Sequence, residues 1–242
     1  MLKKATKRLV VATANPGKLR AFRSLLAGLP FELTSLAELK LPSPAETGST
    51  FLANATLKAR HAATLSGCAA VADDSGLEVD ALGGAPGIYS ARYAGPNADD
   101  GANNEKLMRK LKGVPGEQRR AHYQCVLVFV AAPDATPLEA EASWQGLILN
   151  APRGSGGFGY DPYFWLPELR LSAAELAPEE KNRLSHRGKA LRVLRELLLA
   201  QLGAGELDAA ECGAEELDAA ECGAEELGAA KLGAAEPSGG SA

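Results

Sequence analysis

The sequence contains few cysteines and no long hydrophobic run. Its four cysteines, among 242 residues, form no CxxC pair and lack metal-ligand spacing, so we expect free thiols in a reducing compartment. No stretch approaches the roughly 18 apolar residues of a membrane helix. The apolar segment near the N-terminus is also too short for a secretory signal. These absences predict a cytoplasmic protein that has no membrane partner.

The net charge of −4 comes from one end of the chain. From Met1 to Leu202 the basic residues outnumber the acidic ones by five, whereas residues 203–242 contain ten acidic residues and one lysine. An overall negative charge argues against a nucleic-acid partner. The body is mildly basic, which is compatible with an anionic ligand.

Residues 203–242 form four ten-residue units, each beginning with glycine, and half of this tail is alanine or glycine. Such a segment cannot bury enough apolar surface to offset the entropy lost on ordering. We therefore predict one folded domain over residues 1–202 and a disordered acidic tail over residues 203–242. The tail is either an interaction arm or a tolerated extension.

Segments typical of strands and helices alternate along the body. Apolar runs predict strands at Arg8–Thr13, Phe31–Ser35, Cys68–Ala72, Tyr123–Ala132 and Leu138–Leu149, with the last two paired. Apolar periodicity predicts helices at about Lys18–Leu29, Thr50–Ser66, Asp99–Lys112 and Arg187–Leu202. This alternation indicates an α/β fold with the sheet between helices, in which ligands gather beyond the strand ends.

The segment Thr13-Ala14-Asn15-Pro16-Gly17-Lys18 follows the first predicted strand and begins a helix. Backbone N–H groups and the helix dipole favour a phosphate at such a turn, and the lysine adds a positive charge. The segment is not a Walker A loop, because Ala12 and Leu19 replace the glycine and the hydroxyl residue of that motif. An ordinary helix start, with proline near its first position, explains the pattern equally well.

Two adjacent carboxylates, Asp73 and Asp74, follow the third predicted strand. Their mutual repulsion is costly unless a cation or a basic side chain offsets it. Beside a phosphate-binding loop, these hard oxygen ligands indicate Mg²⁺. An Asx-turn or helix cap that closes the strand is the structural alternative. No Asp-x-Asp-x-Thr pattern supports an aspartyl-phosphate intermediate.

Two glycine-rich segments supply further candidates. Within residues 83–95, Arg92 could clamp a phosphate or carboxylate, or form a surface salt bridge. Within residues 154–162, Phe158 and Tyr160 could stack on a planar base, or join the core.

Histidines and basic residues near the last helix complete the set. Lys181 precedes this helix, and His186 and Arg187 enter it, where a neutral imidazole and a guanidinium could donate to ring carbonyls. His61 and His122 lie within helix and strand patterns and are interpreted as structural.

The segments TANPGK, TFLANATLKA, ADDSGLEVDALGGAPGIYSARYAG, GGFGYDP and EEKNRLSHRGKAL occur in this order. Together they resemble the inosine-triphosphate pyrophosphatase family, whose bacterial branch is the dITP/XTP pyrophosphatases, from about Leu9 to Leu199. The resemblance implies Mg²⁺-dependent hydrolysis of the noncanonical purine nucleoside triphosphates ITP, dITP and XTP to the monophosphate and pyrophosphate. It also implies a homodimer and an elongated mixed β-sheet flanked by helices, in two lobes with a central cleft.

The resemblance further implies a role for each matching residue. The triphosphate would be held by Thr13, Ala14, Asn15, Pro16, Gly17 and Lys18, with Lys18, Lys58 and Arg92 as charged groups. Asp74 matches the catalytic, metal-binding carboxylate, with Asp73 beside it and Ser75 on the substrate. The base and sugar contacts match Phe158, Gly159, Tyr160, Asp161, Lys181, His186 and Arg187.

Two positions depart from the family pattern. Ala21 stands where the first loop usually continues to a glutamate, and Ala45 aligns with a metal-associated glutamate. Either Glu46 substitutes after a shift of one residue, or metal binding depends on Asp73 and Asp74. These departures motivate one alternative, a catalytically impaired purine-nucleotide-binding module. A further alternative is an enzyme that acts on another phosphoanhydride or on a canonical nucleotide.

Overall fold

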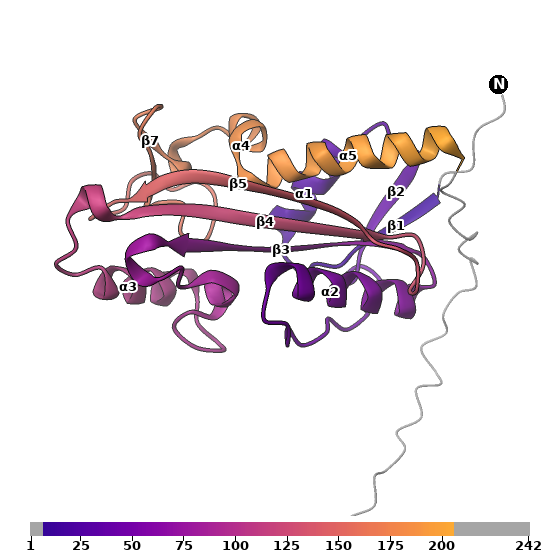
Figure 1. The fold of residues 1–242 in the computed structure, drawn as a ribbon, viewed down its shortest axis with the longest axis horizontal. Helices are drawn as coiled ribbons and strands as arrows, with labels where there is room; N and C mark the ends of the chain where they lie inside the picture. The colour runs from indigo at the N-terminus through magenta and orange to yellow at the C-terminus, as the bar shows by residue number, and fades with distance from the viewer. Residues whose placement is uncertain (1–6, 206–242) are drawn as a thin grey trace, which may run out of the picture. The chain divides into compact units, whose positions relative to one another are not determined.

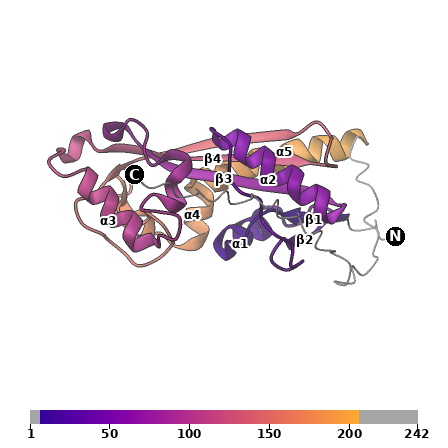
Figure 2. The same cartoon turned by 90° about the horizontal axis from the view of Figure 1, so that it is seen from below.

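The computed structural model describes residues 7–205, which form a seven-stranded sheet with helices on both faces (Figures 1 and 2). The strands are β1 Lys7–Val11, β2 Phe31–Ser35, β3 Ala69–Val79, β4 Arg120–Val130, β5 Leu138–Ile148, β6 Phe164–Leu166 and β7 Leu171–Ser172. The helices are α1 Pro16–Leu25, α2 Phe51–Ser66, α3 Asp100–Lys110, α4 Pro178–Leu184 and α5 His186–Ala204. Short 3₁₀ turns are η1 Asp80–Leu82, η2 Gly87–Arg92, η3 Gly116–Gln118 and η4 Ala173–Glu175. The predicted α/β class is confirmed, while the tail beyond residue 205 lies outside the described residues.

The sheet is mixed because β3 has different neighbours along its two edges. The strand order is β2-β1-β3-β4-β5-β6-β7. β1 pairs in parallel with β2 and with the first residues of β3. On its other edge β3 pairs in antiparallel register with β4 from Ala70 to Val79, and β5, β6 and β7 continue the antiparallel pattern. This mixed sheet with flanking helices is the one that the sequence predicts.

The pleat of the strands divides the core between the two faces of the sheet. Successive side chains on a strand point to opposite faces. Leu9, Val71 and Leu127 pack under α1 and α5, whereas Val10, Ala72 and Val128 pack under α2. Figure 1 shows α5 above the long strands and α2 below them. These strands read as continuous apolar runs because both of their faces are buried.

The far ends of β3, β4 and β5 have a separate core. This third cluster contains Leu77 from β3, Tyr123 from β4 and Trp144 from β5, with Leu107 of α3 and Phe164 of β6. The long strands therefore join two packed regions, which corresponds to the two lobes that the resemblance implies. Strands β3 and β4 contribute residues to both regions.

The third strand is longer than the sequence predicts. The strand was expected to end at Ala72, with Asp73 and Asp74 in the turn beyond it. Instead β3 continues to Val79, because β4 supplies an antiparallel partner for every residue from Asp73 to Val79. The two carboxylates therefore lie in the middle of a strand, and the alternative of an Asx-turn or helix cap at this point is wrong.

Most other predicted elements are confirmed with shifted ends. Thr50 caps α2, as predicted, by accepting a hydrogen bond from the N–H of Ala53 at 3.1 Å. The first helix begins earlier and ends earlier than expected, at Leu25. The sequence interpretation missed α4, β6 and β7, which are only two to seven residues long.

Two further expectations concern the cysteine thiols and helices that could span a membrane. Cys125 is a buried free thiol, as expected. Within residues 7–205, no helix has the length and apolarity required to cross a bilayer.

Helix α5 begins directly after α4, and glycine makes this close junction possible. Ser185 caps α5 by accepting a hydrogen bond from the N–H of Gly188 at 3.2 Å. A Cβ at Gly188 would collide with the carbonyl oxygen of Asn182 in α4. The absence of a side chain here fixes the start of α5, and with it the positions of His186 and Arg187.

We expect Gly188→Ala to lower the free energy of unfolding by about 1–3 kcal/mol, because the new methyl group forces α4 and α5 apart. Urea unfolding followed by circular dichroism measures this loss. The matched control is Gly203→Ala in the same helix, where a Cβ meets no atom within 4 Å. That variant should be as stable as the parent or slightly more stable; equal stabilities of both variants would contradict the prediction.

Candidate functional site

The two adjacent carboxylates of β3 point to opposite faces of the sheet. Asp73 lies on the face covered by α1 and α5, and its carboxylate contacts Lys18 and Arg187. Asp74 lies on the face covered by α2 and contacts Lys58. The pleat of the strand therefore separates two charges that would otherwise repel each other.

Asp73 has partners at both of its carboxylate oxygens. Oδ1 accepts hydrogen bonds from the ammonium of Lys18 and from the Ser75 hydroxyl, the latter at 2.8 Å. Oδ2 accepts a hydrogen bond from Nε of Arg187 at 2.6 Å and lies 3.6 Å from the Sγ of Cys125. The side chain of Asp73 has no exposed surface.

Burial would raise the pKa of the Asp73 carboxyl, but the charges of Arg187 and Lys18 lower it well below its usual range. The carboxylate is thus held ionised between two cations. Asp73 and Asp74 lie on opposite sides of the strand, and Asp73 is paired with two cations. Their role as metal ligands stays a prediction.

Asp74 meets a lysine and an amide on α2. Its Oδ1 accepts a hydrogen bond from the Lys58 ammonium at 2.6 Å, and its Oδ2 accepts one from Nδ2 of Asn54 at 3.3 Å. Asn54 and Lys58 are four residues apart on α2, so they share one face of that helix. Burial raises the pKa of Asp74, and the opposing charge of Lys58 only partly offsets this effect.

Glu46 joins this group from the segment before α2. The Lys58 ammonium lies 3.1 Å from Oε1 of Glu46, and the other carboxylate oxygen is paired with Arg92 of η2. Arg92 therefore forms the salt bridge that was the structural alternative for it. Burial would lower the pKa of Lys58, but Asp74 and Glu46 raise it, so the ammonium stays charged.

The two lysines meet at one backbone atom. The carbonyl oxygen of Asp73 lies 3.4 Å from the Lys18 ammonium and 2.9 Å from the Lys58 ammonium. One lysine comes from α1 and the other from α2, on opposite faces of the sheet. The fold thus concentrates two positive charges beside β3.

The predicted phosphate loop is a capped helix start. Asn15 accepts hydrogen bonds from the N–H groups of Gly17 and Lys18, at 2.8 and 3.1 Å, and its own N–H donates to Oγ1 of Thr13 at 3.1 Å. Pro16 occupies the first turn of α1, where its missing N–H costs nothing. The structural alternative for this segment is therefore realised, but the loop still presents Lys18 to β3.

Phe158 connects this loop with the predicted base contacts. A Cβ built on Gly17 would lie 3.3 Å from Cε1 of Phe158, so the ring lies against the loop. The Lys181 ammonium and the Arg187 guanidinium lie 5.0 and 5.7 Å from the ring centroid. The ring is 39% exposed, which leaves it available for stacking.

The other aromatic residue of this segment has a structural position. Tyr160 is 4% exposed and its hydroxyl donates to the carbonyl oxygen of Ser90 at 2.8 Å. Its ring is part of the third core cluster, and its contact with the base stays a prediction. Gly159 is held by Asp100, whose Oδ2 accepts a hydrogen bond from its N–H at 2.7 Å.

Asp161 is buried and organises its surroundings. Its Oδ2 accepts hydrogen bonds from the N–H of Phe158, at 2.7 Å, and from the Lys181 ammonium. A Cβ at Gly157 would collide with this carboxylate, and Gly157 also has a φ of +75°, so the position requires glycine. Asp161 therefore holds Phe158 and Lys181 in place.

His186, at the start of α5, is buried among aromatic rings. Its imidazole is stacked on Tyr123, with ring centroids 4.6 Å apart and planes 13° apart. Burial, assisted by the charge of Arg187, lowers the pKa of His186 well below its usual value. The ring is thus neutral and carries one N–H donor.

Some residues of this arrangement were missed from the sequence. Asn54 and Tyr123 contact the predicted residues directly, yet neither was assigned a role from the sequence, although Asn54 lies in the family-like segment TFLANATLKA. The spacing of four residues between Asn54 and Lys58 is a signal that points to Asn54. Nothing in the sequence alone brings Tyr123 to His186, because 63 positions separate them.

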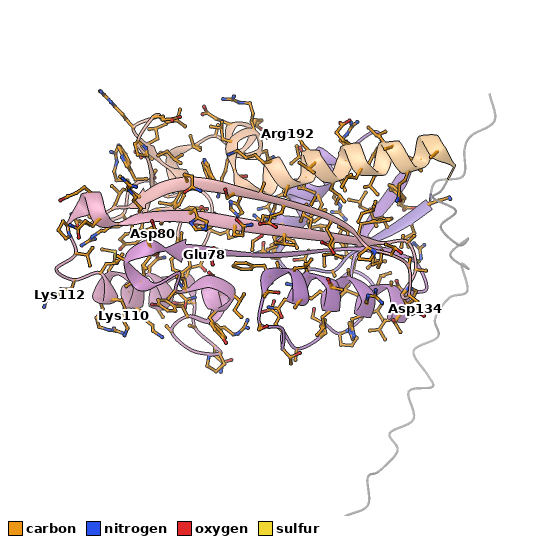
Figure 3. The ribbon with its side chains drawn as sticks, in the orientation of Figure 1. Glu78, Asp80, Lys110, Lys112, Asp134 and Arg192 are labelled. Atoms are coloured by element: carbon orange, nitrogen blue, oxygen red, sulfur yellow. The ribbon has the colours of Figure 1, made fainter. Side chains whose placement is uncertain are left out.

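Each of the two remaining histidines has a polar partner. Nε2 of His61 lies 3.0 Å from the carbonyl oxygen of Pro42. His122 of β4 lies 2.8 Å from Oε2 of Glu78, which Figure 3 labels on β3.

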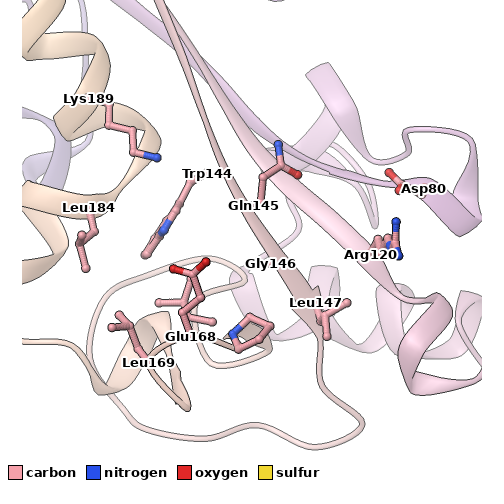
Figure 4. Close-up of a pocket in the computed structure, with 12 residues that line it drawn as sticks. Asp80, Arg120, Trp144, Gln145, Gly146, Leu147, Glu168, Leu169, Leu184 and Lys189 are labelled. Carbon is pink, nitrogen blue, oxygen red and sulfur yellow. The ribbon is translucent and has the colours of Figure 1, made fainter.

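A pocket of about 690 Å³ lies beside this arrangement rather than at it (Figure 4). It is lined by residues of β5, the segment after β6 and the α4–α5 region, including Trp144, Leu169 and Lys189. None of the predicted site residues lines it. The indole of Trp144, whose ring centroid is 6.3 Å from that of His186, connects the pocket wall with the site.

The donor set fits a magnesium ion only in part. Within residues 7–205, no group of three or more His, Cys, Asp or Glu side chains is placed to hold a metal ion. Mg²⁺ usually takes one or two carboxylates together with phosphate oxygens and water. Asp74 and Glu46 meet that need, since the Lys58 ammonium already lies between their oxygens as a cation.

The two family departures have different surroundings. Ala21 is buried in the core beside Phe22, whereas Ala45 is exposed. Glu46, the next residue, is the one that reaches Lys58. Metal binding by Glu46 after a shift of one residue stays a prediction.

Comparisons with known proteins agree with the fold. A family model described as the Ham1 family matches residues 9–197. The chain is 57% identical over 192 residues to a dITP/XTP pyrophosphatase of Pectobacterium atrosepticum, covering 79% of this chain and 98% of the relative. It is 53% identical over 189 residues to a dITP/XTP pyrophosphatase of Vibrio cholerae, covering 78% and 94%. A solved structure of a HAM1 protein from Coxiella burnetii superposes with a TM-score of 0.75 at 43% identity, covering 80% of this chain and 99% of that one.

We expect Asp73→Asn to lower the free energy of unfolding by about 3 kcal/mol or more at neutral pH, because Arg187 and Lys18 lose a buried counter-charge. Urea unfolding measures the loss. The matched control is Glu196→Gln, which removes an exposed carboxylate that lies 3.8 Å from the Arg195 guanidinium and should change stability little.

The contribution of Asp73 to the free energy of unfolding should also depend on pH. Its folded-state pKa is lowered, so its stabilisation is present above the pKa of the unfolded residue and is lost as the pH falls through the folded-state pKa. A stability difference between parent and Asp73→Asn that grew on acidification would contradict this assignment.

Proposed function

The chain belongs to the Ham1 family, and on this basis we propose that it hydrolyses ITP, dITP and XTP to the nucleoside monophosphate and pyrophosphate. It is a hydrolase of nucleotide metabolism, and removal of these noncanonical purine nucleotides from the cellular pool would be its role. The relatives that are 57% identical over 192 residues and 53% identical over 189 residues carry the name dITP/XTP pyrophosphatase.

One observation carries the proposal: two lysines from different helices meet at the carbonyl oxygen of Asp73. Their ammonium groups lie 3.4 and 2.9 Å from that atom. A triphosphate carries several negative charges close together, and stabilising them is most of the catalytic task in phosphoryl transfer. Lys18 and Lys58 supply this charge on opposite sides of one strand.

Asp74 is the proposed catalytic carboxylate. It is buried, faces Lys58, and has a raised pKa. A carboxylate with an ordinary pKa of about 3.9 is a weak base at neutral pH, and a raised pKa improves its capacity to accept a proton. Asn54 and Lys58 hold the carboxylate so that it can orient or deprotonate the attacking water.

A magnesium ion fits the proposal. Asp74 and Glu46 would hold it, together with phosphate oxygens of the nucleotide. The ion supplies positive charge that stabilises the charge developing on the phosphates and lowers the pKa of bound water. Lys58, which lies between the two carboxylates, would remain close to the same phosphates.

The proposed base contacts favour a 6-keto purine. His186 is neutral and can donate one hydrogen bond, and Arg187 has only donors. Donors suit the 6-keto oxygen of hypoxanthine or xanthine but would face the 6-amino group of adenine. A site built on such bonds discriminates by roughly 10⁴-fold or more. Phe158 supplies a half-exposed ring against which the base can stack.

We expect pyrophosphate and the monophosphate from ITP, dITP and XTP in the presence of Mg²⁺, and little from ATP. Ion chromatography of the products measures both. Pyrophosphate from none of these nucleotides would leave the binding-module alternative, whereas equal rates on ATP and ITP would remove the proposed role in nucleotide-pool cleansing.

Asp74→Asn should reduce kcat by roughly 100-fold or more while the fold is retained, since only the charge and the proton-accepting oxygen are removed. Circular dichroism checks the fold. Asp134→Asn, an exposed change in the β4–β5 turn, is the matched control and should keep full activity. Retained turnover in Asp74→Asn would assign the base to another residue.

A homodimer and a cytoplasmic location belong to the same proposal. Both are inferred from what is usual for the family, and not from contacts within residues 7–205. Light scattering of the purified protein would determine the oligomeric state.

The acidic tail is proposed to take no part in the reaction. The repeat after the helix α5 carries none of the residues that match the family's site. Truncation after Gly205, the residue that caps α5, should leave kcat and KM for ITP within twofold of the full chain. A large loss of kcat in the truncated chain would show that the tail contributes.

A further inference from the structure

We propose that Tyr123 is a positioning residue for base selection, whose ring holds the imidazole of His186 in the plane in which it meets the purine. This inference rests on the proposed function, because it concerns the base contacts of the same reaction. Tyr123 itself lies beneath His186 and acts through it.

The geometry is that of an aromatic floor, which consists of Tyr123, Trp144 and Phe164. Tyr123 and Trp144 lie directly opposite each other on β4 and β5. The imidazole of His186 stacks on Tyr123 at 4.6 Å and 13°, and on Trp144 at 6.3 Å and 28°. Phe164 supports Tyr123 from β6, with ring centroids 4.6 Å apart.

Stacking is needed here because hydrogen bonding does not orient this histidine. A functional histidine is usually oriented by a hydrogen bond from its second ring nitrogen. Nδ1 of His186 is buried and has no hydrogen-bond partner within the part of the chain that the structure describes. The aromatic floor is therefore the feature that fixes the plane of the ring.

The ring of Tyr123, rather than its hydroxyl, carries this role. The hydroxyl lies 3.5 Å from Oδ1 of Asp161, which is long for an O–H···O hydrogen bond. Asp161 is held more closely by the N–H of Phe158 and by Lys181. Phenylalanine at position 123 should therefore still orient the His186 ring, whereas leucine should not.

Tyr123 gives a cleaner test than Trp144. Trp144 also lines the pocket shown in Figure 4, so its truncation would change two places at once. Phe129 offers a matched control, because it lies on the same strand six residues further along and therefore on the same face. It is fully buried and packs on Phe31, at 6.4 Å, in the other core.

The experiment compares the full-length parent with Tyr123→Leu, Tyr123→Phe and Phe129→Leu. Calorimetry with Mg²⁺ measures the affinity for inosine monophosphate and, separately, for pyrophosphate. Kinetics gives kcat/KM for ITP and for ATP.

For Tyr123→Leu we expect the inosine monophosphate affinity and the ITP-to-ATP ratio of kcat/KM each to fall about tenfold, with the loss mainly in KM. The affinity for pyrophosphate should stay unchanged, since Lys18 and Lys58 are untouched. Tyr123→Phe should restore both values. Phe129→Leu should lower Tm while leaving both values as in the parent.

Three outcomes would overturn the inference: an unchanged ratio in Tyr123→Leu, an equal loss of both affinities, or the same loss in Phe129→Leu. The nucleotide preference of the parent protein distinguishes a failure of this inference from a failure of the proposed function. If the parent shows no preference for ITP over ATP, the proposed function and this inference are both wrong. If the parent and Tyr123→Leu prefer ITP over ATP to the same degree, only this inference is wrong.

Discussion

The alternation of side chains along β3 is the constraint on which the rest of the site depends. Because Asp73 and Asp74 are consecutive, one faces α1 and α5 and the other faces α2. Each buried carboxylate requires its own counter-charge, since an unpaired buried charge is strongly destabilising. Lysines and an arginine from three helices supply these charges. The ion pairs of these two strand residues therefore connect three helices to the sheet.

This arrangement explains why the site is rigid enough for chemistry. Asp73 is held at both oxygens, and Asp74 is held by a lysine and an amide. Side chains that are already paired and buried lose little further freedom when a substrate binds. The charges proposed to meet a triphosphate are therefore organised before it binds, which is the condition for electrostatic catalysis.

Sequence reasoning predicted local features well and long-range ones poorly. The cap at Thr50, the paired long strands and the alternation of elements follow from neighbouring residues, and the structure confirms them. The end of β3 was wrong because its length depends on a partner strand fifty residues later. The separation of Asp73 from Asp74 and the burial of Tyr160 also depend on which face each residue occupies, which local pattern does not determine. Motif resemblance identified the region of the site; the contacts of Asn54 and Tyr123 required the fold.

Asp73 also connects the two ends of the proposed nucleotide site. The same carboxylate pairs with Lys18, beside the phosphate loop, and with Arg187, beside His186 and Phe158. A displacement of either cation changes the hydrogen bonding available to the other, because both share one buried acceptor. Holding the phosphates and selecting the base would therefore be coupled through β3. A single strand can provide this coupling because its consecutive residues serve different faces: Asp73 joins the two proposed binding ends on one face, while Asp74, held by Lys58 and Asn54 on the other face, is the proposed catalytic carboxylate.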